Sequence, residues 1–217
     1  MPTIEEIRKY YPADDPVHGL SHVLRVYRLC EQIGQKENAN LRILRAAALL
    51  HDIEGDVDLR ENHHLAAADF AEKVLRQENW VEEDILAVLH CIRSHRFRDN
   101  KEEPETLEAQ ILFDADKLDA IGAVGVARAV AYAVRAGMDV YAPPSPHYLK
   151  TGKLAEGESQ TVAHEYLFKL RHIKERIYTK TGRFLAEARH QRLVDFFEGW
   201  MEEIGEYQER YDRLIPD

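Results

Sequence analysis

A histidine and an aspartate stand side by side at the end of an apolar run. His51 and Asp52 follow the segment Ile43-Leu44-Arg45-Ala46-Ala47-Ala48-Leu49-Leu50. A buried carboxylate is costly unless it is paired or coordinates a metal. A neutral imidazole beside a carboxylate is a suitable pair of ligands for a divalent cation. The doublet is therefore the first candidate for a metal site.

Two more polar residues fall on the apolar faces of other predicted helices. His22 shares a helical face with Val26 and Ile33, so its ring is expected to point to the interior, where a lone histidine is otherwise a hydrogen-bonded core residue. Asp116 shares a face with apolar residues of a third helix. Two imidazoles and two carboxylates form a mixed ligand set that suits Mn²⁺, Fe²⁺, Co²⁺, Ni²⁺ or Zn²⁺.

Asp116 belongs to an acidic stretch, Asp114-Ala115-Asp116-Lys117-Leu118-Asp119. Its carboxylates would repel one another if they were all exposed, and a cation between them would remove that repulsion. A solvated helix face fits Asp114 best and Asp116 least. Asp119, one helical turn after Asp116, is expected to orient water or a ligand imidazole.

The elements that must position these residues are helices. The periodicity predicts a short lead at 3–10, helices over about 19–35, 40–52, 63–78 and 81–95, one long helix over 105–136 bent near Gly122 or Gly125, a helical stretch over 159–178, and, after a break at Thr181-Gly182, a final helix to about 211. No convincing strand alternation appears. The sequence predicts an all-α, single-domain helical bundle, with a core over 18–136 and C-terminal helices over 159–211.

Residues 137–158 differ in composition from the rest of the chain. They are rich in proline and glycine and include Lys150 and Lys153. A segment of this kind inside a compact domain is usually a lid or a binding loop. We expect a mobile lid insertion whose two lysines contact a polyanionic substrate.

Composition narrows the function. The chain has 217 residues and a formal net charge of −10, which argues against binding of nucleic-acid polymers or membrane surfaces but allows a small anionic substrate. Cys30 and Cys91 are expected to be reduced packing thiols. The N-terminus does not look like a signal peptide and no apolar run is long enough to span a bilayer, so a cytoplasmic protein is expected. A homodimer is left open.

Four segments in order resemble the HD-domain phosphohydrolase superfamily. They are His18-Gly-Leu-Ser-His22-Val-Leu-Arg25-Val26, Ala47-Ala-Leu-Leu-His51-Asp52, Ile92-Arg-Ser94-His95, and the DADKLDAIGAVGVAR stretch at Asp114–Arg128. More narrowly, the chain resembles small bacterial HD proteins that carry a stretch like the last one. The doublet alone is common by chance, whereas all four segments in order are specific.

The resemblance implies a ligand set and roles for further residues. The metal ligands carried over are His22, His51, Asp52 and Asp116. His22 is preferred to His18 because it precedes the hydrophobic-x-Arg-Val turn, and Asp116 is preferred to Asp114 because a basic residue follows it. Related families use histidines at places similar to His64 and His95, so these contact phosphate, hold a second metal, or do neither.

The sequence departs from the family pattern at one position. Several nucleotide-cleaving HD enzymes place a catalytic glutamate three residues after the His-Asp aspartate, and this chain has Gly55 there. Glu54 and Asp56 flank the glycine, so the general acid or base stays open between them.

The resemblance points to a metal-dependent phosphohydrolase that acts on nucleotides, with Mn²⁺ the favoured metal. The metal would activate a water for attack on phosphorus, and Arg25, His95 and Lys117 would balance charge on the phosphate oxygens. Pyrophosphate release from (d)NTPs is the first expectation, and a nucleoside monophosphate phosphatase or a cyclic phosphodiesterase is the alternative. Alternatives of other classes are a nucleotide-binding HD sensor without catalysis and a helical scaffold with packed histidines.

Overall fold

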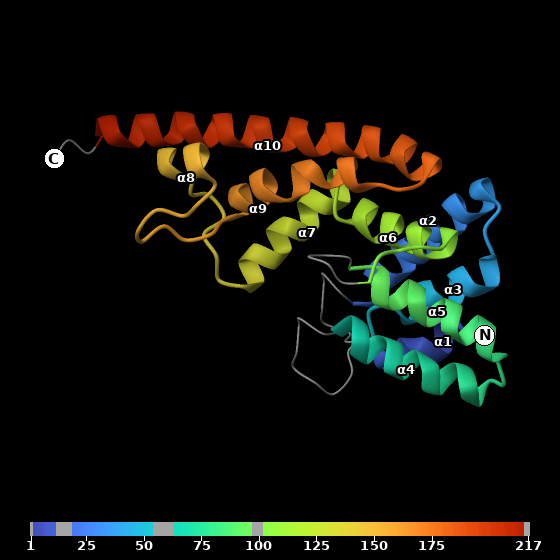
Figure 1. Ribbon diagram of the computed structural model, residues 1–217. Coiled ribbons are helices and arrows are strands. Elements are labelled where there is room, and N and C mark those ends of the chain that lie inside the picture. Colours follow the sequence, from blue (N-terminus) through green and yellow to red (C-terminus); the bar gives the residue numbers. More distant parts are fainter. Residues whose placement is uncertain (1, 12–18, 54–62, 97–101, 215–217) are drawn as a thin grey trace. The chain divides into compact units, whose positions relative to one another are not determined.

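The structure is a computed structural model that describes residues 2–11, 19–53, 63–96 and 102–214, with side chains up to residue 205 (Figure 1). Every regular element in these ranges is a helix, which confirms the all-α prediction. The chain forms two compact units, residues 1–119 with 177–185, and residues 120–176 with 186–217. His18, Glu54 and Asp56 lie outside the described residues, so their predictions stay untested.

The first unit contains the predicted metal ligands. Its helices are α1 (Ile4–Ile7), η1 (Arg8–Tyr10), α2 (Leu20–Glu37), α3 (Leu41–Leu50), α4 (His63–Gln77), α5 (Glu82–Ser94) and α6 (Leu107–Asp119), and it includes the start of α10 (Lys180–Leu214). Helix α2 packs against α3 and α6, and α5 packs against α3, α4 and α6 (Figure 1). The ligand-bearing helices α2, α3 and α6 therefore share one core.

A tight connection joins α2 to α3. Asn38 ends α2 in the left-handed conformation, with φ of 60°, and the Asn40 side chain accepts hydrogen bonds from the backbone N–H groups of Arg42 and Ile43 at the start of α3. A Cβ atom on Gly34 would lie 2.7 Å from a methyl carbon of Leu44. Glycine at this position therefore allows the two helices to approach closely.

The long helix predicted over 105–136 is instead two helices. Helix α6 ends at Asp119, and α7 (Gly122–Arg135) begins after Ile121, which is extended. Gly122 has φ of +77°, a conformation that residues with a side chain rarely adopt. The prediction of a bend near Gly122 was wrong in kind, because the helix stops here and leaves Asp119 at the end of α6.

The second unit contains α7, α8 (Pro146–Thr151), α9 (Val162–Phe168), η2 (Leu170–Arg176) and most of α10. The stretch predicted to be helical over 159–178 is divided between α9 and η2. Thr181 and Gly182 lie inside α10 and do not break it.

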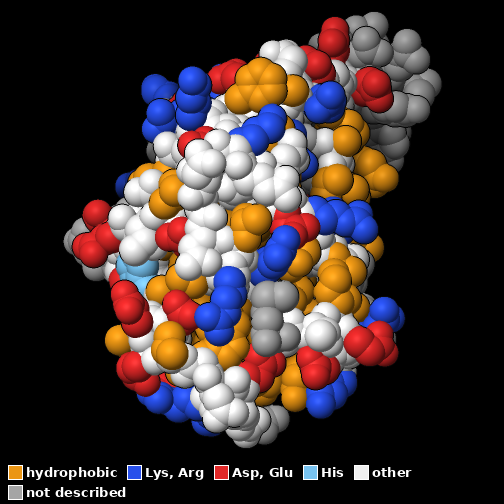
Figure 2. Space-filling model, turned by 90° about the vertical axis from the view of Figure 1, so that its right-hand side faces the viewer, with side chains coloured by type: hydrophobic (Ala, Val, Ile, Leu, Met, Phe, Trp, Pro, Cys, Tyr) orange, Lys and Arg blue, Asp and Glu red, His pale blue; other side chains and the backbone are white. Residues whose placement is uncertain are grey.

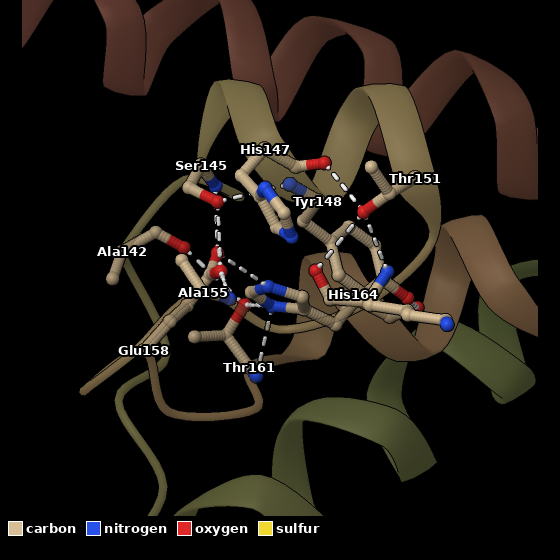
Figure 3. Close-up of polar contacts among 10 residues, drawn as sticks. Ala142, Ser145, His147, Tyr148, Thr151, Ala155, Glu158, Thr161 and His164 are labelled. Atoms are coloured by element: carbon tan, nitrogen blue, oxygen red, sulfur yellow. Dashed lines mark hydrogen bonds and ion pairs between the residues drawn. The ribbon is translucent and has the colours of Figure 1, made fainter.

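The segment predicted as a lid contains helix α8 and a partly buried polar cluster (Figure 3). Glu158 accepts hydrogen bonds from the backbone and hydroxyl of Ser145 and from the backbone of Ala155, each at 2.7 Å. The His164 ring lies 3.0 Å from the same carboxylate and bonds Thr161 through Nδ1. We call these residues, Ser145, Ala155, Glu158, Thr161 and His164, the Glu158 clasp. It ties the segment to the start of α9.

The surface carries side chains of both charges. Acidic and basic side chains are interspersed with apolar ones over the face in Figure 2. In the described part of the chain, no helix combines the length and apolar character needed to cross a membrane. Cys30 and Cys91 are buried and unbridged, as predicted.

Candidate metal centre

Three helices of the first unit bring the predicted ligands together. His22 lies in the first turns of α2 on its buried face, as the helical period predicted. His51 and Asp52 directly follow the last residue of α3, and Asp116 lies in the final turn of α6. Because α2 packs on both α3 and α6, the polar ends of the three helices converge on one point.

The ligand atoms are close enough to share one ion. One atom each of His22, His51 and Asp52 lies within 4.8 Å of the other two. The His22 Nε2 atom is 3.8 Å from Asp52 Oδ2 and 3.5 Å from Asp116 Oδ1. Residues separated by more than ninety positions in the sequence therefore bring their ligand atoms close enough together to bind one ion.

His51 presents an unused nitrogen to this space. Its Nδ1–H donates to the Ala48 carbonyl at 2.9 Å, so the neutral ring carries its lone pair on Nε2. The Nε2 atom is buried and has no hydrogen-bond partner among the residues that the structure describes. Burial lowers the pKa of the His51 imidazole, which keeps the ring neutral at neutral pH. A buried nitrogen acceptor of this kind is usually satisfied, and a cation would satisfy it.

His22 is held in the same tautomer by a carboxylate. Its Nδ1 atom lies 2.7 Å from Asp119 Oδ2, which accepts the Nδ1 proton and leaves the lone pair on Nε2. That lone pair faces the carboxylates of Asp52 and Asp116. Three electron-rich groups directed at one point repel one another unless a cation lies between them. The donor set of two imidazoles and two carboxylates therefore fits a divalent transition metal.

Asp116 stays ionised. Burial works to raise the pKa of its carboxyl, but the Lys117 ammonium beside it holds that pKa well below its usual value. The Lys117 ammonium lies 2.8 Å from Asp116 Oδ2 and also donates to the His95 carbonyl. One oxygen of Asp116 thus pairs with Lys117, and the other faces His22.

Asp114 is not on a solvated face, and that interpretation was wrong. Its side chain is 0% exposed and accepts hydrogen bonds from the backbone of Tyr178 at 2.8 Å and from the backbone and hydroxyl of Thr179 at 2.8 and 2.7 Å. The Asp114 carboxylate therefore connects α6 to the beginning of α10, and its oxygens are already engaged there.

One further histidine lies beside the doublet. His95 follows α5 and is buried, with its ring centroid 5.2 Å from that of His51. Its Nδ1–H donates to the Ile92 carbonyl, and burial followed by the proximity of His51 holds its pKa well below the usual value. A neutral ring attracts a phosphate less than an imidazolium does. The neutral ring is also the form that can bind a metal. His64 is buried in the first turn of α4.

Tyr11 is a residue that the sequence analysis missed. Its ring is buried, and its hydroxyl donates to the Leu49 carbonyl at 2.8 Å, at the end of α3. Burial, followed by the charge of Asp52, raises the pKa of Tyr11 well above its usual value. The hydroxyl thus holds the helix end from which His51 and Asp52 extend. No local motif marks this tyrosine, because its partner lies 38 positions away.

The remaining predicted residues are distributed as follows. Arg25 lies one turn after His22 and bonds Asp119. Lys150 and Lys153 are exposed side chains of the second unit, so their contact with a substrate stays a prediction.

Comparison with known proteins identifies the class of protein to which this fold and this site belong. The HD domain model matches residues 19–121. Bacillus subtilis YpgQ, an uncharacterized protein, is 35% identical over 182 residues, which cover 82% of this chain and 80% of YpgQ. The chain therefore belongs to the HD-domain family, as the sequence motifs indicated.

Solved structures agree with this assignment. The crystal structure of B. subtilis YpgQ in complex with ADP matches with a TM-score of 0.67 and 30% identity over 99% of this chain and 98% of that one. An HD-superfamily hydrolase from Bacillus thuringiensis matches with a TM-score of 0.65 and 28% identity over 92% of both chains.

Proposed function

We propose that this protein is a metal-dependent phosphohydrolase of nucleotides that releases pyrophosphate from nucleoside or deoxynucleoside triphosphates. The observation that carries the proposal is the convergence of His22, His51, Asp52 and Asp116. The buried Nε2 atom of His51 has no hydrogen-bond partner in the described part of the chain. These residues would hold the cation, with Mn²⁺ favoured over Mg²⁺ because imidazole nitrogens suit Mn²⁺ better. Bound there, such an ion supplies a nucleophile near neutral pH and neutralises charge on a phosphoryl oxygen.

The protein's own residues keep the ligands ready for the ion. The Ala48 carbonyl and the Asp119 carboxylate accept the Nδ1 protons of His51 and His22, so both rings direct a lone pair to the same space. Acceptors behind metal-ligating histidines fix the ring orientation and raise ligand basicity. The site is therefore organised before a metal arrives, which reduces the ordering that binding must otherwise impose.

A nucleotide substrate is supported by charge and by a relative. Lys117 lies beside Asp116 and supplies a cation next to the proposed metal site, where it would balance a phosphate oxygen. His64 and His95 would line the same site, and Lys150 and Lys153 would contact the polyphosphate. YpgQ has been crystallised with ADP, a nucleoside diphosphate. Glu54 and Asp56 stay the candidates for the general acid or base.

A substrate screen tests the proposal. The metal-stripped protein is supplied with Mn²⁺, Co²⁺, Ni²⁺ or Mg²⁺ and offered nucleoside mono-, di- and triphosphates and cyclic nucleotides, with orthophosphate and pyrophosphate assayed separately. We expect pyrophosphate from triphosphates with Mn²⁺ or Co²⁺. Orthophosphate from monophosphates alone would make the protein a nucleotidase, and turnover of cyclic nucleotides alone would make it a phosphodiesterase.

Two variants connect the activity to the site. Asp116→Asn should lose activity, whereas Asp69→Asn should keep it, because Asp69 is an exposed carboxylate on α4. Metal binding without turnover of any nucleotide would indicate that the protein is a nucleotide-binding sensor and not an enzyme. Equal activity of both variants would refute the proposal that Asp116 belongs to the active site.

A further inference from the structure

Arg25 forms a chain of contacts that ends at the metal-facing ring of His22. Its Nε–H donates to Asp119 Oδ1 at 2.7 Å and its Nη2–H donates to Asp119 Oδ2 at 3.0 Å. The same Oδ2 atom lies 2.7 Å from His22 Nδ1. Arg25 and His22 are on the same face of α2, one turn apart, and Asp119 is the last residue of α6. The carboxylate therefore lies between a guanidinium and an imidazole.

The burial of Asp119 makes the guanidinium necessary. The Asp119 side chain is 1% exposed, whereas that of Arg25 is 30% exposed. A buried carboxylate with no cationic partner is strongly disfavoured. A two-pronged contact also fixes the plane of the carboxylate, which a point charge does not do. Arg25 thus balances the charge of the carboxylate that bonds His22 and helps to fix its orientation.

The state of the His22 ring follows from this contact. With Asp119 as acceptor, the neutral ring keeps its proton on Nδ1 and its lone pair on Nε2, which faces Asp52 and Asp116. If the carboxylate turned away, the ring would place a proton on Nε2, where two carboxylates would accept it. The ligand atom would then be lost to a hydrogen bond.

We propose that Arg25 is a positioning residue that acts through Asp119 to hold His22 in its metal-binding tautomer and orientation. The inference rests on the metal site of the proposed function, but it differs from the expected role of Arg25 as a phosphate contact. Within the part of the chain that the structure describes, the Arg25 side chain donates its two hydrogen bonds to the two oxygens of Asp119. The Nε–H and Nη2–H groups of Arg25 are therefore engaged by Asp119.

The first test determines the tautomer of the His22 ring directly. Protein labelled with ¹⁵N on histidine is examined without metal by NMR, at a pH well above the usual imidazole value of about 6.5. The nitrogen shifts and proton couplings distinguish the two neutral tautomers, and comparison with His22→Gln assigns the signals. We expect the Nδ1–H form of His22 to dominate in the native protein, and a mixture or the Nε2–H form in Arg25→Gln and Asp119→Asn. Arg25→Lys should be intermediate.

Metal affinity provides the second readout. Mn²⁺ binding, followed by electron paramagnetic resonance, should weaken about 10- to 100-fold in Arg25→Gln, the usual effect of removing an outer partner of a ligating histidine. Arg28→Gln is the matched control, because Arg28 is an exposed arginine on the same helix. Circular dichroism confirms that each variant folds.

The outcomes are distinct. An unchanged His22 tautomer and unchanged Mn²⁺ affinity in Arg25→Gln, with a raised KM for nucleotides, would overturn the proposal and make Arg25 a phosphate contact. If Arg25→Gln did not fold, the same unchanged tautomer in Arg25→Lys and Asp119→Asn would overturn it equally. The NMR readout uses metal-free protein, so it stands even if no nucleotide is hydrolysed and the proposed function fails.

Discussion

Replacing Asp114 by asparagine should separate the structural aspartate of α6 from the proposed ligand. Asp114 is 0% exposed and accepts two backbone N–H groups and one hydroxyl from Tyr178 and Thr179. Asparagine has nearly the same shape but only one acceptor oxygen. Its amide NH₂ group would face donors, so at least one buried N–H loses its partner.

The size of the effect follows from these contacts. A hydrogen bond to a charged group contributes about 1.5–3 kcal/mol, and a buried donor left unpaired costs about 1–3 kcal/mol. Since the three bonds share one carboxylate, they do not add fully. We expect a loss of about 3 kcal/mol in the free energy of unfolding. For a chain of this length, this corresponds to a Tm lower by roughly 6–12 °C.

Two assays on the same variant check the reasoning. Urea and thermal denaturation of Asp114→Asn, with Asp69→Asn as the exposed control, measure the loss of stability. Mn²⁺ binding well below Tm should stay within about twofold of the native value, because the carboxylate is engaged by residues 178–179. Normal stability with lost metal binding would refute the reasoning and would exchange the roles of Asp114 and Asp116.

Two further predictions concern residues that support the site and the lid segment. Tyr11→Phe should lower the free energy of unfolding by about 1 kcal/mol and weaken Mn²⁺ binding severalfold, because the Leu49 carbonyl loses its donor; the partly exposed Tyr10→Phe should do neither. In the Glu158 clasp, backbone hydrogen bonds from Ala155 and Ser145 lower the pKa of Glu158 to about 2. Its stabilising effect should therefore be complete above the ordinary value of 4.5 and disappear as the pH falls towards 2, and urea denaturation of Glu158→Gln should lack this pH dependence.

The helical period was sufficient to predict the inward positions of two ligands. His22 precedes and His51 follows apolar residues at helical spacing, and both are buried. The end of the apolar run placed Asp52 at a helix terminus, although the helix predicted to reach residue 52 ends at Leu50. Local patterns are reliable here because the side chains on one face of a helix share one environment.

The roles of the other aspartates depended on contacts distant in the sequence. Asp114 was assigned to a solvated face, yet its donors lie 64 and 65 positions later, where no local pattern could indicate them. Arg25 and Asp119 are 94 positions apart. Their pairing follows from the packing of α2 on α6, which the sequence alone does not specify.

The sequence pattern did not indicate the break between α6 and α7. Ala120 and Ile121 before Gly122 and Ala123 and Val124 after it continue the apolar pattern. The periodicity therefore predicts one helix. Gly122 marked the place correctly, but the periodicity did not indicate that Ile121 is extended and that the helix stops there.

The most direct test of the account titrates Mn²⁺ into metal-free protein and follows bound Mn²⁺ and pyrophosphate release from a deoxynucleoside triphosphate in the same samples. The account predicts that both rise together in the native protein and that both are lost in His51→Ala, whereas the exposed His172→Ala behaves as native. Pyrophosphate release that is independent of bound Mn²⁺, or undiminished Mn²⁺ binding in His51→Ala, would contradict the account.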